Sequence, residues 1–443
     1  MAEADTIFAL SSAPGRAGVA VVRVSGPRAG AAIDALAPPR PKERAAALRR
    51  IRAPDTGEVI DQALVLWLAA PKTETGEDMV ELHLHGGPAI VKSVLSALGA
   101  LPGCRLAEPG EFARRAFENG KIDLAEAEGL ADLIDAETEA QRRQALAQMG
   151  GALSALYEGW RGELIEACAL VEAAIDFSDE TDVAIDAFEL ARSRVAALVS
   201  DIGAHLEDGN RGEILREGFR VVLAGPPNVG KSSLLNALAR REAAIVSEEA
   251  GTTRDVIEVR LDLEGFPVVV SDTAGIREPL GAIEREGIRR TLAHAREADL
   301  VVWLVDASAA LVAPPPELAA RGDNIFLGLA NKIDVPGALP PPHLLAVSAK
   351  TGEGLDALTR RLAQIVRERI GVTEAPAITR ARYRAELNSC MSALNTFMSD
   401  RPSDIELRAE DLRRAAHALG RITGRVGVED VLGEIFGRFC IGK

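Results

Sequence analysis

The hydrophobic and polar positions divide the chain into segments with different periods. Between residues 1 and 120, short apolar runs are broken by Pro-Gly and Gly-Gly turns, a pattern typical of strands in a small α+β domain. The predicted strands are Val19–Val24, Ala63–Leu68 and Met79–Leu84. From Lys121 to about Asp208, apolar residues recur at helical spacing and proline is absent, which predicts several long helices.

Short apolar strands alternate with helical stretches between about Arg216 and Gly371, which predicts a doubly wound α/β domain. A helical period returns from Ala381 to Phe439. We therefore predict a multidomain chain: an α+β N-terminal domain (1–120), an α-helical bundle domain (121–215 and 372–443) and an inserted α/β domain (216–371). The predicted α/β strands are Val221–Ala224, Pro267–Val270, Leu300–Val305, Ile325–Leu329 and Leu344–Val347.

Composition excludes several classes of protein. The 443 residues are 47% hydrophobic and 26% charged, which argues against wholesale disorder and coiled-coil or collagen-like composition. The N-terminus is acidic, and the longest apolar stretch, Ala63–Ala70, is too short to span a bilayer. We expect a cytoplasmic protein without membrane attachment. Four scattered cysteines lack C-x-x-C spacing, which argues against a zinc ribbon or a disulfide framework.

The net charge of −15 opposes non-specific binding of nucleic acid. Most of the acidic excess lies in residues 121–215, so the two ends of the chain remain able to meet a polyanion.

Gly225 begins a stretch that fits G-x-x-x-x-G-K-[ST] between a predicted strand and a predicted helix. Such a loop curls backbone N–H groups around phosphates at a helix N-terminus. Lys231 would reach the β- and γ-phosphates, and the Ser232 hydroxyl would bind Mg²⁺. The alternative, a chance glycine-rich turn, is disfavoured by the motifs that follow.

Two further motifs indicate a metal and γ-phosphate site. Asp272-Thr273-Ala274-Gly275 follows a predicted strand, so Asp272 can hold the water shell of the metal. Gly251-Thr252-Thr253-Arg254-Asp255 occupies the place of a switch segment, in which Thr253 would sense Mg²⁺ and the γ-phosphate.

The motif Asn331-Lys332-Ile333-Asp334 closes another predicted strand. The Asp334 carboxylate can accept hydrogen bonds from the ring N–H and the exocyclic amine of guanine, an arrangement that adenine lacks. Ser348-Ala349-Lys350 would bring a backbone N–H to the guanine carbonyl. Because an ATPase needs neither motif, the sequence predicts a P-loop (Ras-like) GTPase domain over 216–371.

The residue that orients the attacking water is not evident. Ile276 follows Gly275 and has no polar group, whereas Ras-like proteins use a glutamine. Glu284, on a predicted helix Ala282–Ala295, is the nearest candidate. On the sequence alone, a solvated helix carboxylate is the better interpretation of Glu284.

These features resemble the tRNA modification GTPase family MnmE, also called TrmE, over the whole chain. The terminal stretch is the most specific match. The matching stretches are Pro14–Arg23, Ser25-Gly26, Thr75–Asp78, His85-Gly86-Gly87, Pro109–Phe112, the GTPase motifs and Phe439–Lys443.

The resemblance implies a GTPase that acts with an FAD-dependent partner protein of the MnmG (GidA) type. Together they would install a carboxymethylaminomethyl-type group at C5 of wobble uridine in certain tRNAs. GTP hydrolysis would drive a K⁺-dependent conformational cycle of the GTPase domain, within a homodimer held by residues 1–120.

The resemblance also completes the predicted nucleotide site. Glu284, Asn228 and Lys231 would be catalytic, with Glu284 orienting water, and Ser232 and Thr253 would bind Mg²⁺. The expected GTP- and GDP-binding residues are Asn228, Val229, Gly230, Lys231, Ser232, Ser233, Ser247, Glu248, Glu249, Ala250, Gly251, Thr252, Thr253, Asp272, Thr273, Ala274, Gly275, Asn331, Lys332, Asp334, Ser348, Ala349 and Lys350.

A K⁺ ion is implied at the place of an arginine finger, bound by Asn228, Ser247, Glu249 and Thr252. There it would neutralise charge that develops on the transferred phosphoryl group. The chain departs from the family at Glu249, where an apolar residue is commoner, so this loop is where K⁺ affinity would differ.

The resemblance further implies that the N-terminal domain binds 5-formyl-tetrahydrofolate or a related reduced folate through Arg23, Glu81, Lys121 and Lys443. A cationic side chain can hold the glutamate tail, and a carboxylate can pair with pterin donors. Without the resemblance, each of these residues would be interpreted as a surface charge.

Three other residues leave alternatives open. His83 and His85 share a strand face, but with no third ligand nearby a packed or hydrogen-bonded role is favoured over a metal pair. Cys440 does not fit a prenylation signal, because Lys443 is not a usual terminal residue of that signal and Gly442 is not aliphatic. A catalytic or redox thiol and a packed tail cysteine are the alternatives, and the packed tail cysteine is favoured at least as strongly.

Two other functions compete with this interpretation. A ribosome-assembly or signalling GTPase would use the same four motifs as a binding switch. A folate-dependent transferase with an attached regulatory GTPase is the third possibility. Folate binding by the N-terminal domain and a requirement for a partner protein discriminate among the three.

Overall fold

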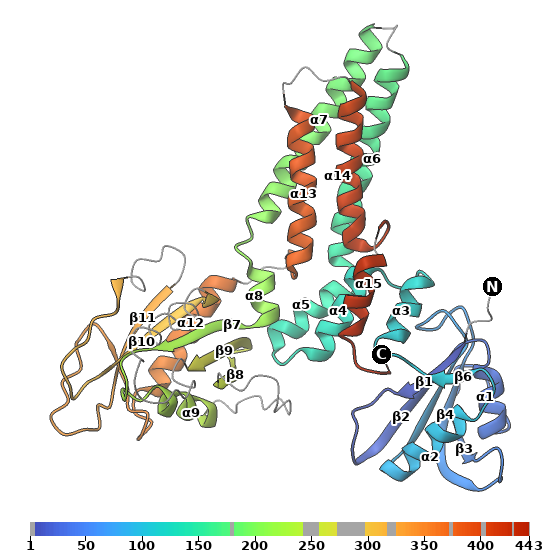
Figure 1. The fold of residues 1–443 in the computed structure, drawn as a ribbon, viewed down its shortest axis with the longest axis horizontal. Helices are drawn as coiled ribbons and strands as arrows, with labels where there is room; N and C mark the ends of the chain where they lie inside the picture. The colour runs from blue at the N-terminus through green and yellow to red at the C-terminus, as the bar shows by residue number, and fades with distance from the viewer. Residues whose placement is uncertain are drawn as a thin grey trace, which may run out of the picture. The chain divides into compact units, whose positions relative to one another are not determined.

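The computed structural model divides the chain into two compact units, Met1–Ala131 with Gly420–Lys443 and Asp132–Leu419 (Figure 1). Among the residues that the structure describes, no helix has the length and apolar character needed to cross a bilayer. The structure describes residues 5–177, 181–241, 257–272, 297–316, 325–371, 375–399, 405–427 and 429–442.

The first unit is built on a six-stranded sheet of order β3-β4-β5-β2-β1-β6. Neighbouring strands are antiparallel except β1 and β6, which are parallel. The three predicted strands are present as β2, β4 and β5, whereas β1, β3 and β6 were not predicted. The strands are β1 (Thr6–Leu10), β2 (Ala17–Ser25), β3 (Ala47–Arg52), β4 (Val59–Leu68), β5 (Met79–Gly86) and β6 (Cys104–Leu106).

The two faces of this sheet differ because side chains alternate along each strand. Val80, Leu82 and Leu84 of β5 are buried in a core shared with α1 (Ala29–Leu36) and α2 (Pro88–Gly99). The intervening side chains of β5 are half-buried or exposed and form the opposite face, which is called the open face below. They are Glu81, His83 and His85.

The C-terminal tail completes the first unit. Helix α15 (Glu429–Gly437) packs against α3 (Glu111–Glu118), and Ile441 forms a β-bridge with Pro109. Gly442 has φ +99°, and a Cβ there would lie 2.2 Å from the Leu10 carbonyl oxygen. Only glycine fits at this position. Helices α4 (Leu124–Asp135) and α14 (Ile405–Thr423) contribute residues to both units.

The second unit contains the predicted α/β sheet, of order β12-β11-β10-β7-β9-β8. All neighbours are parallel except β8 and β9. Leucine and valine side chains of these strands share a core with α9 (Lys231–Arg241) and α12 (Leu355–Ile370). The strands are β7 (Phe219–Ala224), β8 (Ile257–Leu263), β9 (Phe266–Asp272), β10 (Leu300–Asp306), β11 (Ile325–Asn331) and β12 (Leu345–Ala346).

The predicted helices are also present in this unit. Helix α7 packs against α6 and α13 (Figure 1), and Arg413 of α14 pairs with Glu172 of α6 at 2.9 Å. The fold-class prediction is confirmed, while the domain boundaries at 121, 216 and 372 stay a prediction. The remaining helices are α5 (Glu139–Met149), α6 (Ala152–Asp176), α7 (Thr181–Leu206), α8 (Arg211–Glu217) and α13 (Ala381–Met398).

Helix α5 contacts the turn between β8 and β9. Thr138 begins the helix with a capping box. The backbone N–H of Ala140 donates to the Gly265 carbonyl at 3.0 Å, and Arg260 of β8 pairs with Glu137 at 3.3 Å. Gly265 has φ +91°, which favours glycine in this tight turn.

Candidate functional site

A glycine-rich loop joins β7 to α9 at the carboxyl edge of the parallel sheet, where ligands of open α/β sheets bind. Two glycines are required by close contacts. A Cβ on Gly225 would lie 2.4 Å from the Leu304 carbonyl oxygen, and one on Gly230 would lie 2.4 Å from Nδ2 of Asn331. The loop therefore keeps its backbone close to β10 and β11, with its N–H groups at the start of α9.

Lys231, the first residue of α9, is buried. Its Nζ donates to the carbonyl oxygens of Gly225 at 2.9 Å and Pro226 at 3.0 Å. Burial lowers the pKa of the Lys231 ammonium, and the nearby Asp272 charge opposes that shift. An anion bound in the loop would favour the charged form of Lys231 in the same way as Asp272 does.

Ser232 and Asp272 meet at the end of the loop. The Ser232 hydroxyl donates to the Asp272 carboxylate, which is buried at the end of β9. A hydroxyl and a carboxylate oxygen side by side are donors that Mg²⁺ prefers. The residues present therefore fit a magnesium ion.

The predicted guanine-recognition residues lie close together after β11 and β12. The Ser348 hydroxyl donates to Oδ1 of Asp334 at 2.6 Å, and Nζ of Lys350 lies 4.0 Å from its Oδ2. The hydrogen bond from Ser348 holds the pKa of Asp334 below its ordinary value. The carboxylate is thus ionised near neutral pH and able to accept from two base N–H groups.

Asn331 connects three of the motifs. Its Nδ2 donates to the Val229 carbonyl at 2.8 Å, and its Oδ1 accepts from the Ala349 N–H at 3.0 Å. The side chain is only 2% exposed. In this structure Asn331 therefore links the phosphate loop to the Ser348–Lys350 segment.

Asp306, which the sequence analysis missed, belongs to the same arrangement. Nζ of Lys332 donates to Oδ2 of Asp306 at 2.7 Å and to the Asn228 carbonyl at 2.6 Å. Burial acts to raise the pKa of Asp306, but the hydrogen bonds from Lys332 and Ser308 outweigh it, so the pKa is lowered. Its position at the end of the apolar strand β10, like that of Asp272 at the end of β9, was the signal available in the sequence.

We predict that Asn331→Ala destabilises both the fold and the site. The change leaves the Val229 carbonyl and the Ala349 N–H without their side-chain partner, at an expected cost of about 1–3 kcal/mol in the free energy of unfolding. Guanine-nucleotide affinity should fall with it. Denaturant titration and a fluorescent-GDP titration measure the two effects, and Asn236→Ala, at an exposed position of α9, is the matched control. Equal stability of both variants would contradict the linking role.

Several predicted site residues lie outside the described residues, so their roles stay predictions. Glu284, the proposed water-orienting residue, is one of them, and so is most of the implied K⁺ loop. The set comprises Ser247, Glu248, Glu249, Ala250, Gly251, Thr252, Thr253, Thr273, Ala274, Gly275, Glu284 and Lys443.

In the first unit, two of the described folate candidates, Arg23 and Lys121, lie beside one loop, residues 73–78. Arg23 pairs with Glu74 of this loop at 2.8 Å and with Glu81 at 3.1 Å. Lys121 lies beside Gly76, where a Cβ would be 3.0 Å from its Cε. Arg23 also stacks over the ring of Phe112 at 5.9 Å. The structure thus brings Arg23 and Lys121 to the same loop, and Glu81 is connected to it through its ion pair with Arg23.

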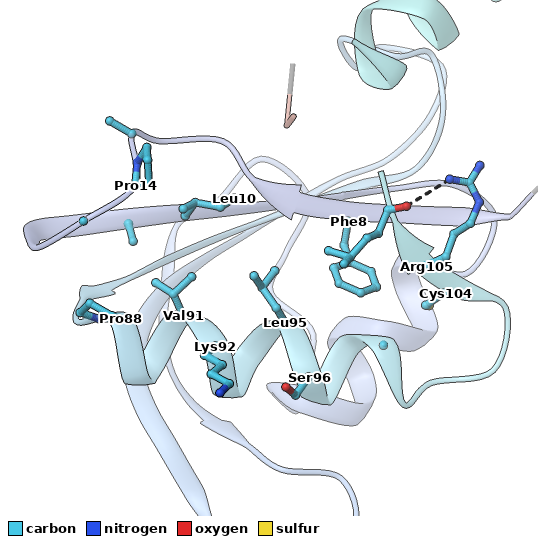
Figure 2. A pocket seen from close by; sticks show the side chains of 15 residues that line it. Phe8, Leu10, Pro14, Pro88, Val91, Lys92, Leu95, Ser96, Cys104 and Arg105 are labelled. Carbon is cyan, nitrogen blue, oxygen red and sulfur yellow. Dashed lines mark hydrogen bonds between the residues drawn. The ribbon is translucent and has the colours of Figure 1, made fainter. Parts of the chain in front are cut away.

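A groove of about 640 Å³ runs along α2 in the same unit (Figure 2). Figure 2 shows Pro14 and Pro88 at one end and Arg105 at the other. Arg23, Glu81 and Lys121 do not line this groove, and Arg23 and Glu81 belong to the open face. The groove is therefore separate from the folate candidates. Its apolar lining includes Phe8, Leu10, Val91 and Leu95.

The exposed Cys440 lies in the C-terminal tail. Its carbonyl oxygen accepts from the Gly110 N–H at 3.5 Å, so the backbone at this position helps to hold the tail. No thiol contact accompanies it among the described residues, and the alternatives for the Cys440 side chain remain open.

The sheet order, the glycine-rich loop and the grouped Asp334 and Ser348 define a P-loop GTPase. Two family models match the chain: "MnmE helical domain" over residues 124–440 and "GTP-binding protein TrmE N-terminus" over residues 6–121. The chain belongs to the tRNA modification GTPase family MnmE.

Curated relatives agree over the full length. The tRNA modification GTPase MnmE of Parvibaculum lavamentivorans is 55% identical and covers 99% of this chain and 100% of the relative. The protein of the same name from Maricaulis maris is 51% identical and covers 99% of both. Among solved structures, Aquifex aeolicus Era bound to GDP and AlF₄⁻ is 25% identical and covers 42% of this chain and 69% of that one, with a TM-score of 0.26. The family assignment rests on the full-length relatives.

Proposed function

We propose that this chain, with an FAD-dependent partner protein of the MnmG type, installs a carboxymethylaminomethyl-type group at C5 of wobble uridine in certain tRNAs. GTP hydrolysis in residues 216–371 drives the conformational cycle that accompanies the reaction. The observation that carries the proposal is that the chain matches the family over its whole length. The same chain contains the nucleotide-binding residues at the carboxyl edge of the parallel sheet, called the nucleotide edge below, and a group of folate candidates.

The nucleotide edge supports the first half of the proposal. Backbone N–H groups of residues 228–230 and the Lys231 ammonium bind the phosphates, because the loop lies at a helix N-terminus. Asp334 and a backbone N–H of the Ser348–Lys350 segment select guanine. Ser232, Asp272 and Thr253 hold Mg²⁺, which supplies charge neutralisation at the phosphates when bound.

The catalytic step is assigned to Asn228 and Glu284. Asn228, with Ser247, Glu249 and Thr252, would hold K⁺, and the ion would supply a positive charge that stabilises the transition state. Glu284 orients the attacking water. Asn228 has φ +62° and is exposed at the tip of the loop, which leaves its side chain accessible to a cation.

The folate half of the proposal uses Arg23, Glu81, Lys121 and Lys443. Arg23 and Glu81 are paired on the open face, and an ion pair of this kind can rearrange to hold a carboxylate tail and pterin donors. Ser11 donates to the Gly442 carbonyl at 2.8 Å. The C-terminal tail that precedes Lys443 is therefore held beside the end of β1. Ala9 of β1 is the register partner of Arg23 of β2.

We predict that Gly442→Ala weakens reduced-folate binding. The new Cβ would overlap the Leu10 carbonyl oxygen, so the tail must leave its place and Lys443 must move with it. Loss of one charge-assisted contact corresponds to about a tenfold rise in Kd for 5-formyl-tetrahydrofolate. Calorimetric titration measures it. Gly437→Ala, where a Cβ meets nothing within 4 Å, is the matched control, and equal affinities for both variants would contradict the role of the tail.

The homodimer belongs to the same proposal. Residues 1–120 are assigned as the folate-binding and dimerisation domain, and 121–215 with 372–443 as the helical domain. Leu48 and Leu64 are exposed register partners on β3 and β4, and such apolar pairs support a self-complementary contact. Light scattering of the full chain gives the oligomeric state.

The direct test of the proposed function is mass spectrometry of wobble nucleosides in tRNA from a strain that lacks this protein. We expect loss of the C5-modified uridine, restored by the wild-type gene. Unchanged wobble nucleosides together with a defect in ribosome assembly would favour the binding-switch alternative. Modification by the purified chain without a partner would favour the stand-alone transferase.

A further inference from the structure

The motif His85-Gly86-Gly87 has no role in the function proposed above, yet its histidine is held in a defined orientation. Nδ1 of His85 lies 2.7 Å from Oδ1 of Asp61, and the backbone N–H of His85 donates to Oδ2 at 2.8 Å. The Gln62 N–H donates to the same carboxylate at 2.7 Å. Asp61 therefore fixes both the backbone and the ring of His85.

The Asp61 carboxylate is ionised in this arrangement. Burial acts to raise its pKa, but the hydrogen bonds from His85 and Gln62 outweigh burial, so the pKa of Asp61 lies below its ordinary value. An ionised carboxylate only accepts hydrogen bonds, so Nδ1 must carry the ring proton. In the neutral ring, Nε2 then has a lone pair.

His85 differs from its neighbour His83 in the hydrogen bonding of its Nε2 atom. Nε2 of His83 lies 3.2 Å from Oε2 of Glu81. The His85 side chain is 70% exposed, whereas Asp61 is 7% exposed, and within the part of the chain that the structure describes, Nε2 of His85 makes no hydrogen bond. An exposed imidazole whose other ring nitrogen is held by a buried carboxylate has the arrangement of an oriented proton acceptor.

His85 lies on the same strand face as the folate candidate Glu81. The two residues are four positions apart on β5, about 13 Å at the usual rise per residue. A reduced folate with its pteridine, benzoyl and glutamate groups is long enough to extend between them. Other charged or titratable side chains on or beside this face are Arg23 of β2, Arg50 of β3, Asp61 of β4, Glu74 of the 73–78 loop, and Glu81 and His83 of β5.

The proposed reaction requires a base on this face. When a one-carbon unit carried by a folate forms a bond to uridine C5 or to an amine, that carbon replaces a hydrogen of the acceptor. The bonding electrons stay with the acceptor, and the hydrogen leaves as a proton. A positioned side chain that takes this proton contributes about 10²–10⁴-fold to the rate.

We propose that His85 is the general base of the modification reaction, taking that proton on Nε2, and that Asp61 is its positioning residue. The bond between the one-carbon unit and the folate nitrogen breaks, and its electron pair stays on that nitrogen, while a bond from the carbon to the acceptor forms. The bond from the acceptor to hydrogen breaks and an Nε2–H bond forms. Asp61 keeps the ring oriented through Nδ1, and the proton on Nε2 is returned to solvent. This inference rests on the proposed function, because it needs the folate-dependent step.

The test compares His85→Gln and Asp61→Asn in the full-length protein with its partner protein, substrate tRNA and a reduced folate. Both variants should lower the modification rate roughly 10²–10⁴-fold, and His85→Gln should also remove the acidic limb of the pH–rate profile. GTP hydrolysis and the Kd for the folate should stay within about twofold. His83→Gln, which retains a donor toward Glu81, is the matched control and should keep most of the rate.

Asp61→Asn also has a spectroscopic consequence. An asparagine amide that donates to Nδ1 moves the ring proton to Nε2, so ¹⁵N resonances of the imidazole should show Nδ1–H in the wild type and Nε2–H in the variant. Unchanged modification rates in both variants, with the wild type active, would overturn the assignment of His85 as the general base. A rate loss that merely follows a lowered melting temperature or a raised folate Kd would overturn it too. A wild-type protein that gives no folate-dependent modification would instead overturn the proposed function, and this inference with it.

Discussion

Asp334→Asn is expected to change the base preference of the nucleotide site from guanine to xanthine. The wild-type carboxylate accepts two N–H groups of guanine, and each charge-assisted hydrogen bond is worth about 1.5–3 kcal/mol. Loss of both corresponds to roughly 10²–10⁴-fold weaker GDP binding. Xanthine has a carbonyl in place of the exocyclic amine, so an Asn amide can donate to it while its own oxygen accepts the ring N–H.

Competition titrations with GDP, XDP and ADP measure this change. Ser348→Ala is the graded control, because it removes the hydrogen bond to Asp334 but keeps the carboxylate. That variant should lose some affinity and remain selective for guanine. Equal binding of GDP and ADP by the wild type, or no gain of XDP binding by Asp334→Asn, would show that Asp334 does not recognise the guanine base.

The second large effect concerns the alkali ion. Replacing K⁺ by Na⁺ should lower kcat for GTP hydrolysis, because the larger ion suits a site of several carbonyl oxygens and one amide. By analogy with removal of a preorganised charge-stabilising group, we expect a fall of roughly 10²–10³-fold. The affinity for GTP should change little, since the ion acts on charge that develops in the transition state.

Steady-state hydrolysis at constant ionic strength, with K⁺, Na⁺ or a large organic cation, measures this dependence. Asn228→Ala should remove the response to K⁺, and Asn236→Ala should keep it. A rate indifferent to the cation in the wild-type protein would contradict the K⁺ site and direct attention to Glu249, where the chain departs from its family.

Much of the nucleotide edge was predictable because the loop, the strand ends and the base-recognition motifs have fixed spacing. Lys231, Ser232 and Asp272 gather as the pattern indicated. Asp306 was missed because its partner, Lys332, lies 26 residues away, directly after the neighbouring strand β11, and pairing across a parallel sheet leaves no local period.

The N-terminal unit was less predictable from its sequence. Strand β1 is a short buried run without alternation. Strand β3 reads Ala-Leu-Arg-Arg-Ile-Arg, and this mixture of arginine and apolar residues without strict alternation does not distinguish a strand from a loop. The pairing of Asp61 with His85 depends on the register of β4 against β5, which only the folded sheet fixes. The sequence favoured a packed or hydrogen-bonded role for the two histidines, and the hydrogen bonds of His83 and His85 agree with it.

The contact between α5 and Gly265 has a mechanical consequence. The hairpin of β8 and β9 extends from Asp272 at the nucleotide edge to its turn on α5, a span of about 20 Å along β9. The β8–β9 hairpin therefore connects the α/β sheet to the helices, in addition to the two covalent connections of the chain. A swing of the sheet about those connections must break the backbone hydrogen bond between Ala140 and Gly265 and the Glu137–Arg260 ion pair, so these two contacts resist such a motion.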